Sequence, residues 1–144
     1  SGIRGTIGGR SGENLTPVDI VKFSAAFGSW VKRRNKDVRN MVVGRDARIS
    51  GPVVSDLVIS TLRSMGITVT DLGLATTPTV ELAVAGTGAA GGIIITASHN
   101  PSQWNALKLL NEKGEFLSAR DGEEVLDIAR DEDLFLPKPD MRAG

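Results

Sequence analysis

Residues 92–101 have the sequence Gly-Ile-Ile-Ile-Thr-Ala-Ser-His-Asn-Pro, and the fold can be worked out from this stretch. Its three consecutive isoleucines form the most strand-like run of the chain, as expected for a strand that is buried on both faces. Small and polar residues follow, among them His99, the only histidine of the chain. In α/β domains the loop after such a strand usually carries the chemistry. The Ser98 hydroxyl is therefore a candidate nucleophile or phosphate carrier, and the alternative is a polar turn that only ends the strand.

Helices and strands alternate on both sides of this stretch. Helix starts are indicated by Thr16-Pro17 and Thr77-Pro78, where a hydroxyl is followed by a proline, and by Ser118 with Asp121. The predicted elements are, in chain order, a helix from Thr16 to the basic residues near Lys36, a strand at 41–43, a helix from Ser50 to Gly66, a strand at 67–69, a helix from Thr77 to Gly86, the strand at 92–95, a short strand at 106–110 and a helix from Ser118 onwards. This alternation predicts an α/β sheet with helices on its faces.

The length and composition are those of one globular domain. The chain has 144 residues, of which 40% are hydrophobic, and its 17 basic and 17 acidic residues give a formal net charge of zero. Balanced charge provides no overall attraction to nucleic acid or to an anionic membrane, so neither is an expected partner. The absence of cysteine excludes disulfides and thiolate chemistry. No apolar run approaches the roughly 20 residues that span a bilayer, and no signal peptide is recognisable, so a cytoplasmic protein is expected.

Two glycine-rich segments with arginines are candidates for binding an anion. Residues 2–10 contain Arg4, and residues 44–51 contain Arg45 and Arg48. Glycine allows backbone N–H groups to approach an anion closely, and a guanidinium can clamp phosphate with two hydrogen bonds. For the first segment, the alternative is a flexible start with solvated arginines.

Two other segments have the composition of functional motifs, but we interpret them as structural. The basic residues at 32–36 have no interleaved aromatic residues, so they are interpreted as the solvated end of a helix rather than as a nucleic-acid site. Residues 86–91 have the glycine spacing of a dinucleotide-binding loop. That loop must follow a strand and open a helix, whereas this one follows a helix and precedes a strand. It is therefore predicted to be a helix-to-strand turn.

The chemistry of the Ser98 stretch favours a phosphate carrier over a hydrolase triad. Ser98 and His99 are neighbours, so their side chains point apart in extended backbone. A Ser–His pair needs nitrogen and oxygen within about 3 Å and a third group that orients the histidine. Phosphoryl transfer depends instead on positioning and on neutralised charge. The positive groups would come from Arg4, Arg45, Arg48 and Lys108.

Four segments, in matching order along the chain, resemble the motifs of the α-D-phosphohexomutases, the phosphoglucomutase/phosphomannomutase family. Residues 96–101 are similar to the phosphoserine loop, 2–5 to the N-terminal Gly-Ile-Arg-Gly segment, 44–51 to the Gly-Arg-Asp-x-Arg-x-Ser segment and 105–108 to the Asn-Gly-x-Lys segment. Ala106 replaces the usual glycine, which concerns only the local turn. The resemblance covers nearly the whole chain, and four ordered motifs are far more specific than any one of them.

The resemblance implies a fold and an activity. The fold would be a single-domain, three-layer α/β/α sandwich with a small mixed sheet. The full-length enzyme would be an intramolecular phosphotransferase of the isomerase class, which moves a phosphoryl group between the 1 and 6 positions of a hexose phosphate. Phosphorylated Ser98 would pass its phosphate to the substrate and give a bisphosphate intermediate, so a glucose 1,6-bisphosphate-type activator is also implied.

The resemblance also assigns roles to the candidate residues. Arg4 and Lys108 would flank the transferring group, with Lys108 a candidate for general acid/base help. His99 and Asn100 would shape the loop and contact the substrate or the phosphoserine, and the alternative for His99 is a hydrogen-bonded loop residue. Arg45 and Arg48 would bind phosphate, and the alternative is that they pair with Asp46.

Much of the implied active site would lie in other domains. Mg²⁺ would be held by the Ser98 phosphate together with carboxylates of an Asp-Gly-Asp-x-Asp-Arg loop, and no such loop occurs in this chain. The acidic cluster at 131–133 lacks that pattern and is interpreted as a solvated helix end. Residues 1–136 are expected to form the first domain and 137–144 the start of a linker to a second. The chain would need the remaining domains as partners, and alone it is expected to be inactive on its hexose phosphate substrate.

Two alternatives to this function remain. The first is a phosphoglucosamine mutase, a relative that commonly has serine where Thr96 stands. The second is a non-catalytic α/β module that binds a sugar phosphate or a partner domain through the same loops.

Overall fold

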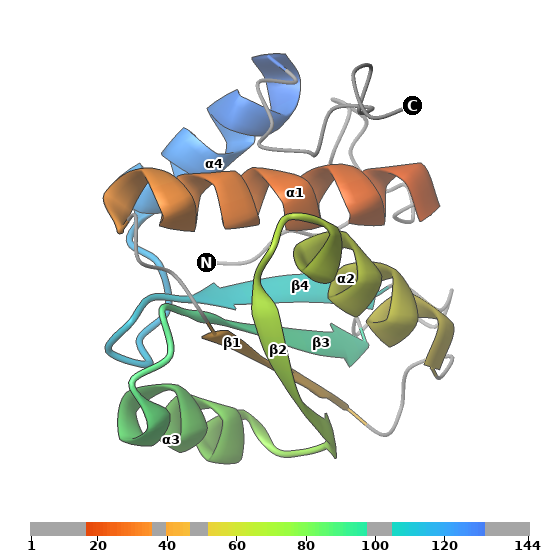
Figure 1. The fold of residues 1–144 in the computed structure, drawn as a ribbon, viewed down its shortest axis with the longest axis vertical. Coiled ribbons are helices and arrows are strands. Elements are labelled where there is room, and N and C mark those ends of the chain that lie inside the picture. Colours follow the sequence, from red (N-terminus) through yellow and green to blue (C-terminus); the bar gives the residue numbers. More distant parts are fainter. Residues whose placement is uncertain (1–16, 36–39, 47–51, 98–104, 132–144) are drawn as a thin grey trace, which may run out of the picture.

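The computed structural model describes residues 17–35, 40–46, 52–97 and 105–131, in which helices cover both faces of one sheet (Figure 1). The elements are, in chain order, α1 (Pro17–Arg34), β1 (Asn40–Arg45), α2 (Pro52–Ser64), β2 (Thr68–Leu74), α3 (Thr77–Thr87), β3 (Gly92–Ala97), β4 (Asn105–Leu110) and α4 (Ala119–Asp131). The predicted α/β/α sandwich with a small mixed sheet is confirmed.

The four strands form one sheet in the order β2-β1-β3-β4. β1 pairs in parallel with β2 and with β3, and β4 is antiparallel to β3. Parallel neighbours need crossover connections, which α2 and α3 supply. As a consequence, the carboxyl ends of β1, β2 and β3 and the amino end of β4 meet at one edge of the sheet, which we call the carboxyl edge.

The larger hydrophobic core lies between the sheet and the layer formed by α1, α2 and α4. α1 packs against both α2 and α4, and its apolar residues recur at helical spacing, as the sequence predicts. Fully buried residues from the two layers meet here, including Phe27, Leu62, Ile93 and Leu107. Burying a side chain of this size stabilises the fold by roughly 1.5–3 kcal/mol.

The smaller core lies on the opposite face, which α3 covers alone (Figure 1). Ile94 points into this core, while its neighbours Ile93 and Ile95 point into the larger one, so the three isoleucines of β3 are buried on both faces. A Cβ on Gly44 or Gly92 would lie 2.6 Å from a valine methyl of α3. Glycine at these two positions therefore allows α3 to pack directly on β1 and β3.

Most element boundaries agree with the sequence prediction, and β2 is the main difference. The predicted strand at 67–69 continues to Leu74, because β2 remains paired with β1 past a register shift between Val43 and Gly44. The chain turns at 111–115, and the predicted Ser118 cap of α4 is confirmed by a 3.1 Å hydrogen bond from the Asp121 N–H to the Ser118 hydroxyl. The segment at 86–91 does connect α3 to β3. None of the helices in the described ranges combines the length and the apolar character needed to cross a membrane.

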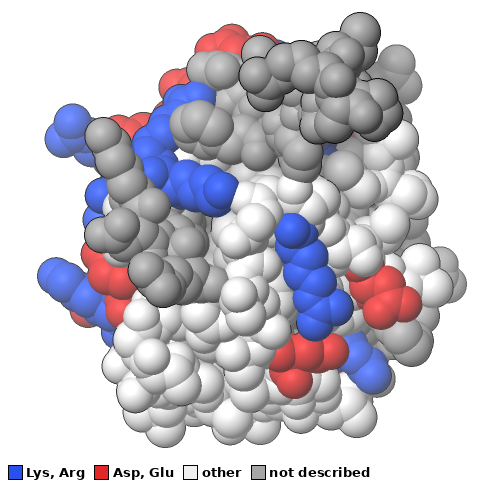
Figure 2. Space-filling model, viewed as in Figure 1, with Lys and Arg blue, Asp and Glu red and all other residues white. Residues whose placement is uncertain are grey.

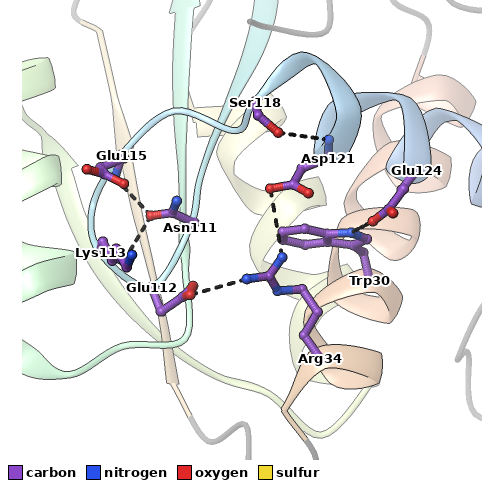
Figure 3. A network of polar contacts seen from close by, with 9 residues as sticks. All are labelled: Trp30, Arg34, Asn111, Glu112, Lys113, Glu115, Ser118, Asp121 and Glu124. Atoms are coloured by element: carbon purple, nitrogen blue, oxygen red, sulfur yellow. Dashed lines mark hydrogen bonds and ion pairs between the residues drawn. The ribbon is translucent and has the colours of Figure 1, made fainter.

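The basic end of α1 makes more contacts than a solvated helix end would (Figure 3). The Arg34 guanidinium lies 4.4 Å from the centre of the Trp30 ring, and it is 3.3 Å from a Glu112 carboxylate oxygen. The Lys32 ammonium donates a hydrogen bond to the Met65 carbonyl at the end of α2. The end of α1 is exposed at Arg34, in line with a solvated helix end, and Arg34 and Lys32 also contact other parts of the fold.

Candidate functional site at the carboxyl edge

The carboxyl edge is tied together by backbone contacts between three strands. Arg45, the last residue of β1, lies opposite Leu74 of β2 and Ile95 of β3. The Asp46 N–H donates to the Ile95 carbonyl at 2.8 Å, and the Ala75 N–H donates to the Arg45 carbonyl at 3.1 Å. The chain segments that leave β1, β2 and β3 therefore start side by side.

Thr96 is placed where β3 reaches this edge. Its side chain is 9% exposed and lies on the α3 face of the sheet, two residues after the buried Ile94. Ser98, His99 and Asn100 follow directly in the chain but lie outside the described residues. The structure thus places the strand that leads into the phosphoserine-like loop, and the loop itself remains a prediction.

Lys108 lies on the neighbouring strand, on the same face as Thr96. It is the direct partner of Ile94 in the antiparallel pair of β3 and β4, and Thr96 is paired with Ala106. Side chains diagonal to one another in such a pair are roughly 7–8 Å apart at the Cα atoms, within reach of a lysine. The structure therefore brings the strand that carries Lys108 next to the strand that leads to Ser98. Lys108 is half-buried.

Arg45 lies on the opposite face of the sheet. It is two residues after Val43, whose side chain points into the larger core, and it is half-buried. Side chains alternate between the two faces along a strand, so Arg45 and Lys108 leave the sheet on different sides. Arg4 and Arg48 lie outside the described residues. Of the seven candidate site residues, the structure places only Arg45 and Lys108.

A pocket of about 440 Å³ opens at the carboxyl edge on the α3 face. The N-terminus of α3 forms one wall, where Thr76 is the N-cap and its hydroxyl accepts a hydrogen bond from the Thr79 N–H at 3.3 Å. The described residues that line the pocket are Asp46, Leu74, Ala75, Thr76, Thr77, Ile94 and Thr96. Sequence reasoning missed this pocket, although the helix start predicted at Thr77-Pro78 was a signal for it.

The described residues do not by themselves provide a metal site. Among them, no group of three or more His, Asp or Glu side chains lies close enough together to hold a metal ion. The carboxyl edge contributes one lining carboxylate, that of Asp46. A magnesium ion at this edge would therefore need ligands from outside the described residues.

A second polar cluster lies away from this edge, between α1, α4 and the turn after β4 (Figure 3). The Trp30 indole N–H donates to the Glu124 carboxylate at 2.9 Å, and the Arg34 guanidinium pairs with Glu112 and, at 3.8 Å, with Asp121. These contacts join segments that are far apart in the sequence. We interpret the cluster as a structural connection that holds α4 against α1.

Sequence comparison agrees with the motifs. Residues 1–135 match the sequence profile of the phosphoglucomutase/phosphomannomutase alpha/beta/alpha domain I. A phosphoglucomutase/phosphomannomutase of Thermococcus kodakarensis is 44% identical over 112 residues, which are 76% of this chain and 25% of that protein. A phosphoglucosamine mutase of Levilactobacillus brevis is 38% identical over 145 aligned positions, covering 96% of this chain and 30% of the relative. The chain thus spans between a quarter and a third of these relatives.

Solved structures give the same result. A protein of Thermus thermophilus assigned as a phosphomannomutase superposes with a TM-score of 0.77 at 27% identity, over 90% of this chain and 28% of that chain. A phosphoglucomutase/phosphomannomutase family protein of Burkholderia thailandensis superposes with a TM-score of 0.73 at 27% identity, over 95% of this chain and 30% of that chain. With a family profile matched along 1–135, the chain belongs to the phosphoglucomutase/phosphomannomutase family and carries its α/β/α domain I.

Proposed function

We propose that this chain is the phosphoryl-carrying domain of a phosphohexomutase, which moves a phosphoryl group between the 1 and 6 positions of a hexose phosphate. The observation that carries the proposal is the pairing of β3 with β4. It brings the strand that runs into the 96–101 motif next to the strand that carries Lys108. β1 ends beside them with Arg45 of the 44–51 motif, so described parts of three of the four motifs lie at the carboxyl edge. Arg4 and Arg48 lie outside the described residues.

The proposed reaction has two transfers. In the first, a hydroxyl oxygen of the sugar phosphate attacks the phosphorus of phosphorylated Ser98, and the bond between phosphorus and the serine oxygen breaks. The attacking hydroxyl loses its proton to a base, and the serine oxygen takes up a proton. The resulting bisphosphate turns round and returns its other phosphoryl group to Ser98 by the reverse chemistry. Such transfers are catalysed mainly by positioning and by positive groups around the transferring phosphoryl group.

The roles of the side chains follow from the motifs. Arg4 and Lys108 flank the transferring group, and Lys108 is the candidate proton carrier because its strand lies next to β3. His99 and Asn100 contact the phosphoserine or the substrate. Arg48 would contribute phosphate contacts from the loop after β1, and Arg45 would do so from the opposite face of the sheet.

The proposal includes partners outside this chain. Mg²⁺, held by the Ser98 phosphate and by carboxylates of a further domain, and a glucose 1,6-bisphosphate-type activator are part of it, as is a cytoplasmic location. Sugar recognition would also lie in further domains, because the chain spans only 25–30% of the relatives it matches. Alone, the chain is therefore proposed to be inactive as a mutase.

One observation supports glucosamine phosphate as a second candidate substrate. The relative that spans 96% of this chain is a phosphoglucosamine mutase, whereas the more identical relative from Thermococcus kodakarensis is a phosphoglucomutase/phosphomannomutase. Glucosamine phosphate therefore belongs beside glucose and mannose phosphate in any substrate assay. Thr96 stands where phosphoglucosamine mutases commonly have serine, which favours the other two substrates.

Intact-mass spectrometry tests the phosphate carrier directly. In a hybrid in which this chain replaces the matching quarter of the Thermococcus kodakarensis relative, incubation with glucose 1,6-bisphosphate and Mg²⁺ should increase the mass by one phosphoryl group. Ser98→Ala should lose this increase, whereas Ser102→Ala, a matched substitution in the same stretch, should keep it. An increase that survives in Ser98→Ala would place the phosphate elsewhere and contradict the proposal. A module that only binds sugar phosphate would show no increase with either protein.

A further inference from the structure

We propose that the pocket at the N-terminus of α3 is a subsite for neutral sugar hydroxyls, which holds part of the pyranose ring next to the Ser98 loop. This inference rests on the proposed function and deepens it, because it assigns a substrate contact to this domain beyond the phosphoryl group. The Thr96 side chain is nearly buried and lines this pocket.

Thr96 is a buried polar residue whose side chain faces an open pocket. It is 9% exposed, it lines the 440 Å³ pocket, and its hydroxyl has no hydrogen-bond partner within the described part of the chain. Other hydroxyls of the structure bond to a carbonyl one helical turn away, as Thr61 does to Leu57 at 2.7 Å and Ser29 to Ala25 at 2.8 Å. Thr96 lies on a strand and lacks that option. Among the described residues, Ser24 Oγ is the fully buried side-chain oxygen without a partner, so the Thr96 hydroxyl is not sealed off and can bond to a ligand that enters the pocket.

The N-terminus of α3 adds further polar groups. Thr76 and Thr77 line the pocket, and the Thr76 hydroxyl lies 2.8 Å from the Thr79 hydroxyl, so the two share one hydrogen bond. Each hydroxyl can donate one hydrogen bond and accept two. The contact between the two hydroxyls and the bond that caps the helix use only part of this capacity, so the rest is available to a ligand. The helix N-terminus also carries a partial positive charge that favours an oxygen atom of a ligand. The pocket therefore offers several hydroxyls and a helix end to one ligand.

The Asp46 carboxylate decides which ligand fits. It disfavours a bare phosphate, and none of the described residues that line the pocket is a lysine or an arginine. A sugar hydroxyl can donate to a carboxylate and accept from threonine at the same time. Asp46 has a polar partner of its own, but two carboxylate oxygens offer about four acceptor positions in all, so it can accept a further hydrogen bond.

The apolar walls and the size of the pocket agree with a sugar ring. Leu74 and Ala75 supply apolar surface for the C–H groups of a pyranose. The volume lies within the range of roughly 300–1,000 Å³ that is usual for small-molecule sites. Thr96 precedes Ser98 by two residues, so a ring held here would lie next to the phosphoryl carrier.

Amide NMR titration of the 144-residue chain tests the subsite without any mutase reaction. Glucose and glucose 1-phosphate should both shift the amide signals of Ala75, Thr76, Thr77 and Thr96, and inorganic phosphate alone should leave them in place. Thr96→Val keeps the shape of the side chain but lacks the hydroxyl, and it should weaken glucose binding about fivefold, as expected for one lost hydrogen bond. Thr87→Val, a matched change at the far end of α3, should bind glucose as the unchanged chain does.

Each other outcome overturns the subsite. Equal shifts with inorganic phosphate would make it an anion site, and unchanged glucose affinity in Thr96→Val would remove its central contact. If Thr96→Val does not fold, Thr77→Val is titrated in its place and should also weaken glucose binding. Failure of the subsite is distinguishable from failure of the phosphoryl transfer, because the mass increase at Ser98 is measured separately and does not depend on these shifts.

Discussion

Among the described glycines, Gly114 leaves the least room for an added Cβ. It lies in the turn between β4 and α4 with φ +78°, and a Cβ at this position would be 2.4 Å from the Glu81 carbonyl oxygen of α3. Gly88 has a similar φ of +69°, but no atom lies within 4 Å of its added Cβ. Gly114→Ala combines backbone strain with a clash against backbone, whereas Gly88→Ala has strain alone.

We therefore expect Gly114→Ala to lower the free energy of unfolding by about 3 kcal/mol or more, and Gly88→Ala by about 1 kcal/mol. Urea denaturation followed by circular dichroism measures both. Equal losses in the two variants would show that the turn moves away from α3 without resistance, contrary to the packing described above.

Arg34 is expected to stabilise the protein through its planar guanidinium, which stacks on Trp30 and pairs with Glu112. Lysine keeps the charge but cannot reproduce the stacking or the forked geometry. Arg34→Lys should lower the free energy of unfolding by about 0.5–1 kcal/mol. The matched control is Arg130→Lys on α4, whose side chain is 63% exposed and has ion pairs but no described ring contact. That change should stay within about 0.5 kcal/mol, and a larger loss there than at Arg34 would contradict the role of the stack.

At the scale of elements, the cap of α4 is the clearest local determinant. The Ser118 hydroxyl accepts from the Asp121 N–H, one of the N–H groups that have no partner within the helix. Ser118→Ala should lower the free energy of unfolding by about 1 kcal/mol, whereas Ser118→Thr keeps the oxygen and should lose much less. Thermal unfolding of the three proteins compares them. An alanine variant as stable as the threonine variant would show that the cap contributes nothing.

The elements that the sequence predicts well are those with local signals. Prolines, cap hydroxyls and helical spacing define α1, α3 and α4, and three isoleucines define β3. The full length of β2 could not be predicted, because residues 70–74 continue as a strand only through their pairing with β1 across a register shift. Strand extension of this kind depends on a partner some 30 positions away in the sequence.

The motifs of the candidate site could be predicted from the sequence, but the pocket beside them could not. The pairing of 105–108 with the end of β3 follows the order of two motifs along the chain. The pocket is lined from the ends of three strands, at Asp46 after β1, Thr76 after β2 and Thr96 in β3, which only the two crossovers bring together. The contact from Trp30 to Glu124 joins residues that are 94 positions apart in the sequence. The sequence indicates only that Trp30 and Arg34, four residues apart, share one face of their helix.

Over the whole molecule, charged side chains and exposed apolar side chains are unevenly distributed. In the view of Figure 2, charged side chains lie at the upper left, along the left side and across the middle, while the lowest part, where α3 lies, shows mainly uncharged ones. Three of the large exposed hydrophobic residues, Val18, Val53 and Leu74, lie at the starts of α1 and α2 and at the end of β2. The topology places all three at the carboxyl edge. This edge thus combines the candidate site with apolar surface that further domains could cover.

An open carboxyl edge should prevent turnover by this chain alone, because phosphoryl transfer competes with water unless the site is enclosed. We expect the 144-residue chain to give no conversion of glucose 1-phosphate to glucose 6-phosphate in a coupled assay. A hybrid in which this chain replaces the matching quarter of the Thermococcus kodakarensis relative should convert it. Ser98→Ala in the hybrid should reduce the rate by at least about a thousandfold, as loss of a covalent carrier does. Robust turnover by the isolated chain that disappears in Ser98→Ala would show instead that one domain suffices.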